Sequence, residues 1–191
     1  MVKYSRGIDI YFNVLFVGGM HMKTAIIYYS KHHGNTKKLL DAIVETNPDI
    51  QLIDITEKHE VNLCKYDRIG IASGIYFGKF AKQILTFAKI NLPEYSKVFF
   101  VYTYGSADKK TYTKEIKKIV KDLYCDIVGE FGCPGFDDFG PLKLFGGLQK
   151  EHPTVDEINS AVEFYEKVKE TTNALITKRK LRKKLELGTC N

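Results

Sequence analysis

Short apolar runs alternate along the chain with longer amphipathic stretches, which is the pattern of an α/β protein. Five of the runs are rich in β-branched and aromatic residues and have the length of strands buried on both faces. These predicted strands are 24–29, 50–55, 68–72, 98–102 and 127–131. Because a crossover connection separates each pair, we predict one doubly wound α/β domain: a five-stranded parallel sheet with helices on both faces.

Four further stretches carry apolar residues at helical spacing. The first ends before Pro48 and the second before Pro93, because a proline disfavours the helical conformation of the residue before it. The apolar positions of the four predicted helices are Leu39, Leu40, Ile43 and Val44; Phe80, Ile84, Phe87 and Ala88; Tyr112, Ile116, Ile119, Val120 and Leu123; and Val155, Ile158, Val162, Tyr165 and Val168. A segment rich in Gly and Pro, 132–153, precedes the last helix and is long for a simple connection.

The chain has 191 residues and a net charge of +6, and this excess charge lies at the two ends. Residues 1–22 hold two bases and one acid, and residues 178–191 hold six bases and one acid, so that residues 23–177 are neutral. No nucleic-acid-binding motif accompanies the charge, and we expect no nucleic-acid partner. The basic run 178–184 fits a solvated helix end, a disordered tail or weak contact with an anionic membrane surface.

We divide the chain into an N-terminal extension of doubtful native status (1–22), one folded domain (23–173) and a basic C-terminal tail (174–191). The extension lacks the small-residue cleavage site of a secretory signal peptide, and no apolar run reaches the 18 residues or so of a membrane span. None of the four cysteines lies in a C-x-x-C pair. This argues against a metal site and fits a reducing, cytoplasmic location.

The loop after the first predicted strand combines residue types that hold a phosphate group. Ser30 and Thr36 offer hydroxyls, Asn35 offers an amide, and Gly34 lets the backbone approach closely. The first N–H groups of the following helix add donors and a partial positive charge. The loop has neither the P-loop pattern nor the dinucleotide-binding pattern of glycines. A polar turn with an ordinary helix cap is the alternative interpretation.

The sequence Y-S-K-H-H-G-N-T in this loop is similar to the phosphate loop of the flavodoxin family, whose core is S/T-x-x-x-G-N-T after a hydrophobic strand. The resemblance extends over residues 23–170 in the order and spacing of elements. It implies non-covalently bound FMN whose phosphate contacts Ser30, His32, His33, Gly34, Asn35 and Thr36. The two histidines depart from the family, in which hydroxyl residues are common there, and either one is equally well explained as a solvated loop residue.

A second loop follows the third strand, and with the matching first loop in place we expect it to contact the flavin ring. Its residues are Gly74, Ile75, Tyr76, Phe77 and Gly78. Tyr76 or Phe77 is expected to stack on the ring, although aromatic packing under the next helix is the alternative. The stretch 66–87 also looks like the corresponding part of menaquinone-dependent protoporphyrinogen oxidases, which share the flavodoxin fold.

A third loop, after the fourth strand, is expected by the same resemblance to line the other face or the pyrimidine edge of the flavin. It contains Thr103, Tyr104, Gly105 and Ser106, with Tyr104 as a second aromatic wall. An exposed turn tyrosine is the alternative. The segment 133–141 resembles an insertion in flavodoxin-like proteins of anaerobic bacteria and archaea, and we hypothesise that its Phe136 and Phe139 form a lid. Cys133 is expected to be a buried structural thiol rather than a flavin-side one.

The sequence therefore predicts a flavodoxin-like protein that binds FMN and transfers electrons to a redox protein partner. An FMN-dependent oxidoreductase acting on a quinone, a porphyrinogen or another small oxidant or reductant is the alternative. A module that kept the fold and lost the cofactor is a third class, against which the intact G-N-T loop argues. No catalytic residue is assigned, and the sequence does not define the electron donor, the acceptor or the oligomeric state.

Overall fold

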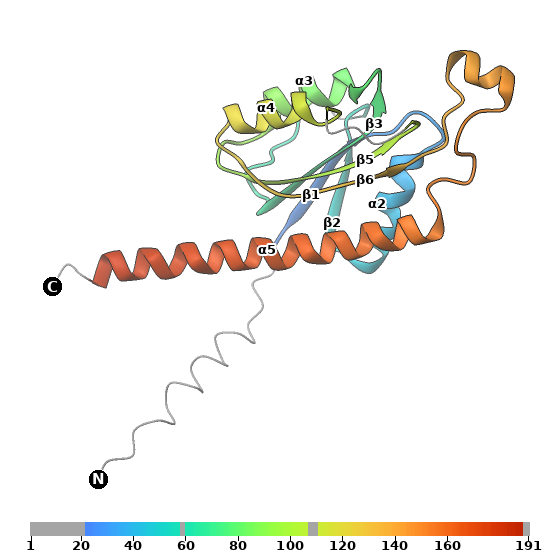
Figure 1. Cartoon of the computed structure of the whole chain (residues 1–191). Coiled ribbons are helices and arrows are strands. Elements are labelled where there is room, and N and C mark those ends of the chain that lie inside the picture. The colour runs from blue at the N-terminus through green and yellow to red at the C-terminus, as the bar shows by residue number, and fades with distance from the viewer. Residues whose placement is uncertain (1–21, 58–59, 107–110, 189–191) are drawn as a thin grey trace, which may run out of the picture.

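The computed structural model describes residues 22–57, 60–106 and 111–188, so that the extension 1–22 lies almost wholly outside the described residues. The chain folds into a sheet with helices on both faces (Figure 1). Five parallel strands stand in the order β2-β1-β3-β5-β6. The strands are β1 (Thr24–Tyr29), β2 (Ile50–Asp54), β3 (Arg68–Tyr76), β5 (Lys97–Tyr104) and β6 (Asp126–Pro134). This confirms the predicted fold class.

Helices cover both faces of the sheet, as Figure 1 shows. They are α2 (Asn35–Thr46) and α5 (Val155–Gly188) on one face, and α3 (Lys82–Asn91) and α4 (Lys114–Asp122) on the other. One apolar core lies between the sheet and α3 and α4 and includes Ile84 and Ile116; the second lies against α2 and α5 and includes Leu40 and Tyr165. Burial on both faces explains why the strands are apolar throughout rather than alternating.

Three strands are longer than predicted, because parallel pairing continues to their carboxyl ends. β3 pairs with β5 as far as Gly74 and Thr103, and β5 pairs with β6 as far as Tyr104 and Pro134. Residues 74 and 103–104, which we predicted to be loops, are therefore strand ends, and residues 75–76 extend β3 through antiparallel pairing. A sixth, two-residue strand, β4 (Lys79–Phe80), pairs antiparallel with β3.

Two predicted helix starts were wrong by a few residues. Phe80 belongs to β4, where it pairs with Ile75 and is buried, and α3 begins at Lys82. Tyr112 is also buried but precedes α4, which begins at Lys114. In both places a core contact, rather than helical periodicity, explains the apolar residue.

The last helix crosses the boundary that we placed at residue 173. α5 runs for 34 residues, about 51 Å at 1.5 Å per residue, and its second half extends past the sheet in Figure 1. Alanine, leucine, lysine and arginine favour helix, and no proline interrupts this stretch, which explains its continuation to Gly188. Among the described residues, no helix combines the length and the apolar character that crossing a bilayer requires.

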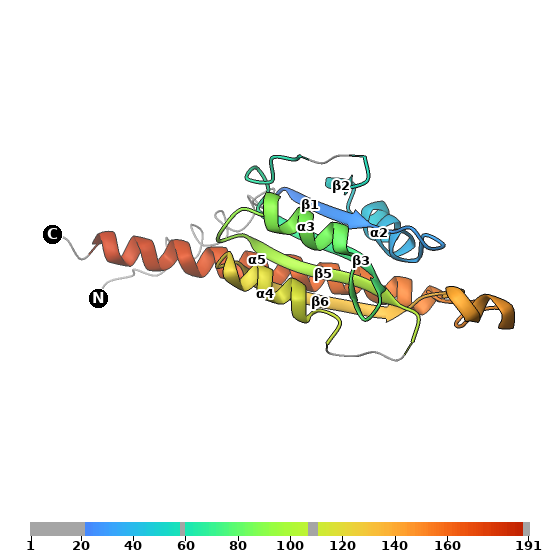
Figure 2. The same cartoon turned by 90° about the horizontal axis from the view of Figure 1, so that it is seen from above.

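In a parallel sheet all strands begin at one side and end at the opposite side, so that the loops gather at these two sides. We call the edge at which the strands end the carboxyl edge and the edge at which they begin the amino edge. The loops after β1, β3, β5 and β6 all meet at the carboxyl edge, where the short 3-10 helix η1 (Gly140–Phe145) also stands (Figure 2). Ligands of open α/β sheets bind at this edge.

Candidate functional site

A cavity of about 160 Å³ lies at the carboxyl edge, and most of the predicted site residues line it. From the predicted set these are Ser30, His32, Asn35, Thr36, Gly74, Ile75, Tyr76, Phe77, Thr103, Tyr104 and Gly105. Four more lining residues come from the segment after β6, namely Gly135, Phe136, Asp137 and Phe139. Three loops that are far apart in the sequence therefore form one site together with a fourth segment.

The loop between β1 and α2 turns sharply before the helix begins. His33 and Gly34 have φ of 51° and 64°, in the left-handed region, and the second of them is the N-cap of α2. Glycine adopts this conformation without the strain that a side chain brings. Within the described part of the chain, the backbone N–H groups of His33, Gly34 and Thr36 have no hydrogen-bond acceptor. These donors, at the positive end of a helix, form an anion-binding arrangement.

Two hydroxyls hold this loop to its surroundings. Ser30 Oγ accepts a hydrogen bond from the N–H of Lys37 at 3.3 Å. Thr36 is fully buried, and its Oγ1 lies 2.9 Å from Oγ1 of Thr103, at the end of β5. The second contact joins the first predicted loop to the third. It fixes residues 30–36, which we call the phosphate loop after their predicted role, relative to strand β5.

The side-chain amide of Asn35 has a hydrogen-bond partner for its nitrogen but none for its oxygen. It is buried, and its Nδ2 donates to the carbonyl oxygen of Phe136 at 2.8 Å. Its Oδ1 is also buried but has no hydrogen-bond partner among the described residues. Since an unpartnered buried acceptor is costly, a ligand that donates a hydrogen bond here stabilises the site.

The aromatic residues of the site differ in how firmly they are held. The hydroxyl of Tyr76 accepts from the N–H of Lys31 at 3.3 Å, its ring lies 5.8 Å from that of Tyr29, and burial raises its pKa. The ring of Tyr104 lies 5.9 Å from that of Tyr112. Phe77, in contrast, is 89% exposed. Tyr76 and Tyr104 thus form fixed walls, and Phe77 stands at the mouth of the cavity.

Residues 135–139, which we call the cover segment, lie against the phosphate loop. The ring of Phe136 is 4.3 Å from that of His33, and the ring of Phe139 is 5.9 Å from that of His32. Asp138 Oδ1 accepts a hydrogen bond from His33 Nε2 at 2.8 Å, which lowers the pKa of the Asp138 carboxyl. The cavity beneath is smaller than the roughly 300–1,000 Å³ of most ligand pockets. A large ligand therefore extends out of this cavity or displaces the cover segment.

Four predicted site residues are not among those that line the cavity. His33 contacts Asp138 and Phe136 instead. Gly34 and Gly78 shape turns, and the Ser106 hydroxyl lies 3.0 Å from that of Tyr112. The lining residues that the sequence analysis did not assign to the site belong to the cover segment, to which its length and its richness in Gly and Phe had pointed.

Cys133 lies outside the site. It is 3% exposed and packs in the core between the sheet and α2 and α5, where burial raises the pKa of its thiol to about 12. This geometry agrees with a structural thiol and not with a flavin-side one. Cys64, which is exposed, serves as an internal comparison.

We expect iodoacetamide to alkylate Cys133 at least about a hundred-fold more slowly than Cys64 near neutral pH, because only thiolates react and a buried, protonated thiol offers few. Mass spectrometry of peptides from the folded protein measures both rates, and a denatured sample, in which the two rates should converge, is the control. Similar rates in the folded protein would contradict the burial of Cys133.

Comparison with known proteins agrees with this architecture. Residues 26–132 match the family described as flavodoxin domain. An uncharacterized protein of Methanocaldococcus jannaschii is 41% identical over 145 residues, which cover 75% of this chain and 95% of that protein. A flavodoxin from the domain Archaea (TM-score 0.52, 19% identity) covers 78% of this chain and 99% of its own. The match with flavodoxin 1 of Bacillus cereus (TM-score 0.56, 15% identity) covers 78% of this chain and 98% of that protein. At these identities the two structures show a shared fold.

Proposed function

Since the chain belongs to the flavodoxin domain family, we propose that it binds FMN without a covalent bond at the carboxyl edge and transfers electrons. The observation that carries the proposal is the unpartnered, buried Oδ1 of Asn35 beside the open N–H groups of the phosphate loop. FMN carries a phosphate, which needs such donors, and ribityl hydroxyls, which need such an acceptor. The residues present therefore fit the cofactor.

The phosphate loop is the part of the site that binds charge. The N–H groups of His33, Gly34 and Thr36 would donate to the phosphate oxygens, and the positive end of α2 adds to the attraction. His32, which lines the cavity from the same loop, offers an imidazole N–H as a further donor.

The strand ends are the part of the site that would hold the flavin ring. Tyr76 and Tyr104 offer fixed aromatic surfaces, and Gly74 and Gly105 bring backbone groups to the cavity. When bound, FMN supplies the electron-accepting and electron-donating chemistry, and the protein supplies orientation and polarity around the ring.

The cover segment would act as a lid over the bound cofactor. It spans from β6 to the phosphate loop, and the hydrogen bonds of His33 with Asp138 and of Asn35 with Phe136 hold it there. Closure of such a segment excludes water from the reacting group. The same contacts must break for the cofactor to enter or leave.

Two exposed aromatic rings favour a second candidate function, an FMN-dependent oxidoreductase acting on a small planar molecule such as a quinone or a porphyrinogen. Phe77 and Phe139 are 89% and 56% exposed, and their rings lie 5.7 Å apart at the mouth of the cavity. Such a pair suits contact with an apolar planar substrate. The two functions are separated by the steady-state rates at which the reduced holoprotein is oxidised by a quinone and by a redox protein. Faster turnover with the quinone favours the oxidoreductase, and faster turnover with the protein favours the electron carrier.

The proposal is tested by the visible spectrum of the purified protein and by titration with FMN. We expect a yellow protein that releases FMN on denaturation, or an apoprotein that quenches the fluorescence of added FMN with 1:1 stoichiometry. Anaerobic reduction and reoxidation should then be reversible. A colourless protein that binds no added FMN contradicts the proposal.

A further inference from the structure

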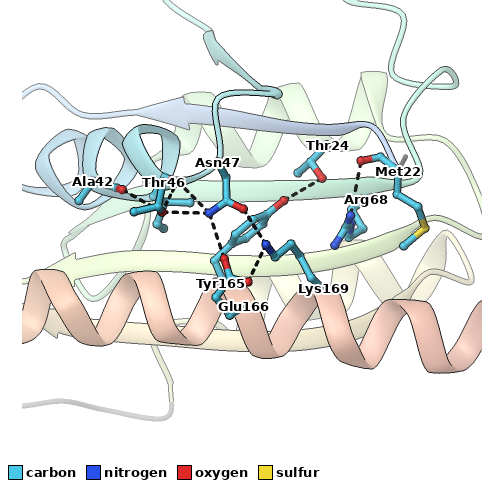
Figure 3. A network of polar contacts seen from close by, with 10 residues as sticks. Met22, Thr24, Ala42, Thr46, Asn47, Arg68, Tyr165, Glu166 and Lys169 are labelled. Atoms are coloured by element: carbon cyan, nitrogen blue, oxygen red, sulfur yellow. Dashed lines mark hydrogen bonds and ion pairs between the residues drawn. The ribbon is translucent and has the colours of Figure 1, made fainter. Parts of the chain in front are cut away.

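A second cavity, of about 460 Å³, lies at the amino edge of the sheet, opposite the proposed FMN site. Its walls come from the starts of β1, β2 and β3, from the C-terminal end of α2 and from the middle of α5. Figure 3 shows the polar residues of this region, in which Asn47, Glu166 and Lys169 form one network and Arg68 stands apart from it. No residue of this cavity lines the first one.

Arg68 is the unusual residue of the second cavity. It is the first residue of β3 and only 4% exposed. Its Nη2 donates to the carbonyl oxygen of Met22 at a long 3.4 Å, whereas Nε and Nη1 have no partner among the described residues. Burial lowers the pKa of Arg68, but an arginine keeps its charge in a protein. A buried guanidinium with two unpartnered donors therefore stands in the wall of this cavity.

The acids around the cavity do not neutralise Arg68 by direct contact. Glu166 is engaged by Lys169 at 2.6 Å and by the Asn47 amide at 3.1 Å. Within the described ranges, no carboxylate lies within 4.0 Å of the Arg68 guanidinium. Buried charges in proteins are normally paired, so an unpaired one that faces a cavity is a candidate for ligand binding.

The side chain of Arg68 packs beside the ring of Tyr165. Its Cζ lies 6.0 Å from the centre of the Tyr165 ring, a cation–π distance. The Tyr165 hydroxyl donates to Oγ1 of Thr24 at 2.9 Å, as the dashed line in Figure 3 shows. The guanidinium thus packs beside this ring, and its Nε and Nη1 keep no hydrogen-bond partner among the described residues.

We propose that this cavity binds a small monocarboxylate, whose two oxygens accept hydrogen bonds from the guanidinium of Arg68. The planar fork of an arginine matches a carboxylate in this way. Asp49, Glu166 and Glu170 also line the cavity, and they disfavour a doubly charged phosphate more than a singly charged carboxylate. Met22 and Ile50 offer apolar surface for a short hydrocarbon chain.

The proposal is tested by isothermal titration calorimetry of the full chain with butyrate. Inorganic phosphate is the competing ligand. We expect saturable 1:1 binding of butyrate that phosphate does not displace. Arg68→Met keeps the side chain long but removes the donors and the charge, and should weaken butyrate binding about ten-fold or more. The exposed Arg179→Met is the matched control and should bind butyrate as the wild type does.

Thermal unfolding gives a second readout. Arg68→Met should unfold at the same or a higher temperature than the wild type without ligand, because it removes an unpaired buried charge, and butyrate should no longer raise that temperature. If Arg68→Met does not fold, Arg68→Lys replaces it, and loss of the fork should still weaken butyrate binding about ten-fold. No butyrate binding, or equal binding by the Arg68 variant and the wild type, overturns the proposal. Binding of FMN is measured on the same samples, so that failure of one site is distinguished from failure of the other.

Discussion

Ser30→Asp is expected to lower the affinity for FMN by more than about 100-fold while the protein remains folded. The new carboxylate would stand in the phosphate loop, and two negative charges a few ångströms apart in a partly buried site repel by several kcal/mol. The fold should tolerate the change, because Ser30 Oγ already accepts the N–H of Lys37 near the start of α2. An acceptor with negative charge is favourable at that end of a helix. Fluorescence titration of apoprotein with FMN measures the effect.

Two controls separate charge from shape in this experiment. Ser30→Asn has nearly the shape of the aspartate without its charge and should lose about ten-fold or less. Riboflavin, which lacks the phosphate, should bind to Ser30→Asp and to the wild type with similar affinity. An equal loss of riboflavin binding would indicate a distorted loop, and undiminished FMN binding would place the phosphate elsewhere.

Gly105→Ala is expected to open the cover segment and to speed the dissociation of FMN about ten-fold or more. A Cβ atom at Gly105 would lie 2.1 Å from Oδ2 of Asp137 and 2.4 Å from its Cβ, which no side-chain rotation relieves. Asp137 is bonded to Leu148 through its backbone (3.0 and 2.7 Å), and its Oδ1 accepts from the N–H of Phe139 at 2.9 Å. Displacing it therefore shifts the whole segment, and losing one or two such contacts corresponds to about a ten-fold change in rate.

Stopped-flow measurement of flavin fluorescence gives this rate, and a second substitution tests its cause. Asp137→Gly removes the atoms that a Cβ at Gly105 would meet. The double variant Gly105→Ala/Asp137→Gly should therefore release FMN at the rate of Asp137→Gly alone, so that the effects do not add. Additive effects would show that Gly105 acts through the flavin and not through the cover segment.

The sheet and the phosphate loop could be predicted from the sequence because each follows from a pattern of residues that are close together in the chain. Uninterrupted apolar runs such as Thr24–Tyr29 are typical of parallel strands, and S-K-H-H-G-N-T joins a strand end to a helix start within seven residues. Their common edge follows from parallel topology alone. For these reasons the parallel sheet and most of the cavity-lining residues could be predicted from the sequence.

The residues at which helices and strands begin and end were harder to predict from the sequence, because tertiary contacts override local conformational preference there. Phe80 fits a helical stripe but pairs with Ile75 in β4. α5 continues well beyond Val168, the last residue of its apolar stripe, because good helix formers follow. The hydrophobic pattern locates the buried face of an element better than it locates where the element ends.

By itself, then, the sequence determined the α/β fold, its flavodoxin-like order and the loop that we propose binds a phosphate. Only the tertiary structure decided that Asp138 pairs with His33, that the cover segment narrows the cavity, and that Arg68 lies buried with free donors at the opposite edge. The physical reason is distance along the chain: His33 and Asp138 are 105 residues apart, and Arg68 reads locally as the polar start of a strand. Periodicity and turn chemistry act over a few residues, whereas the presence or absence of a partner depends on how the whole chain packs.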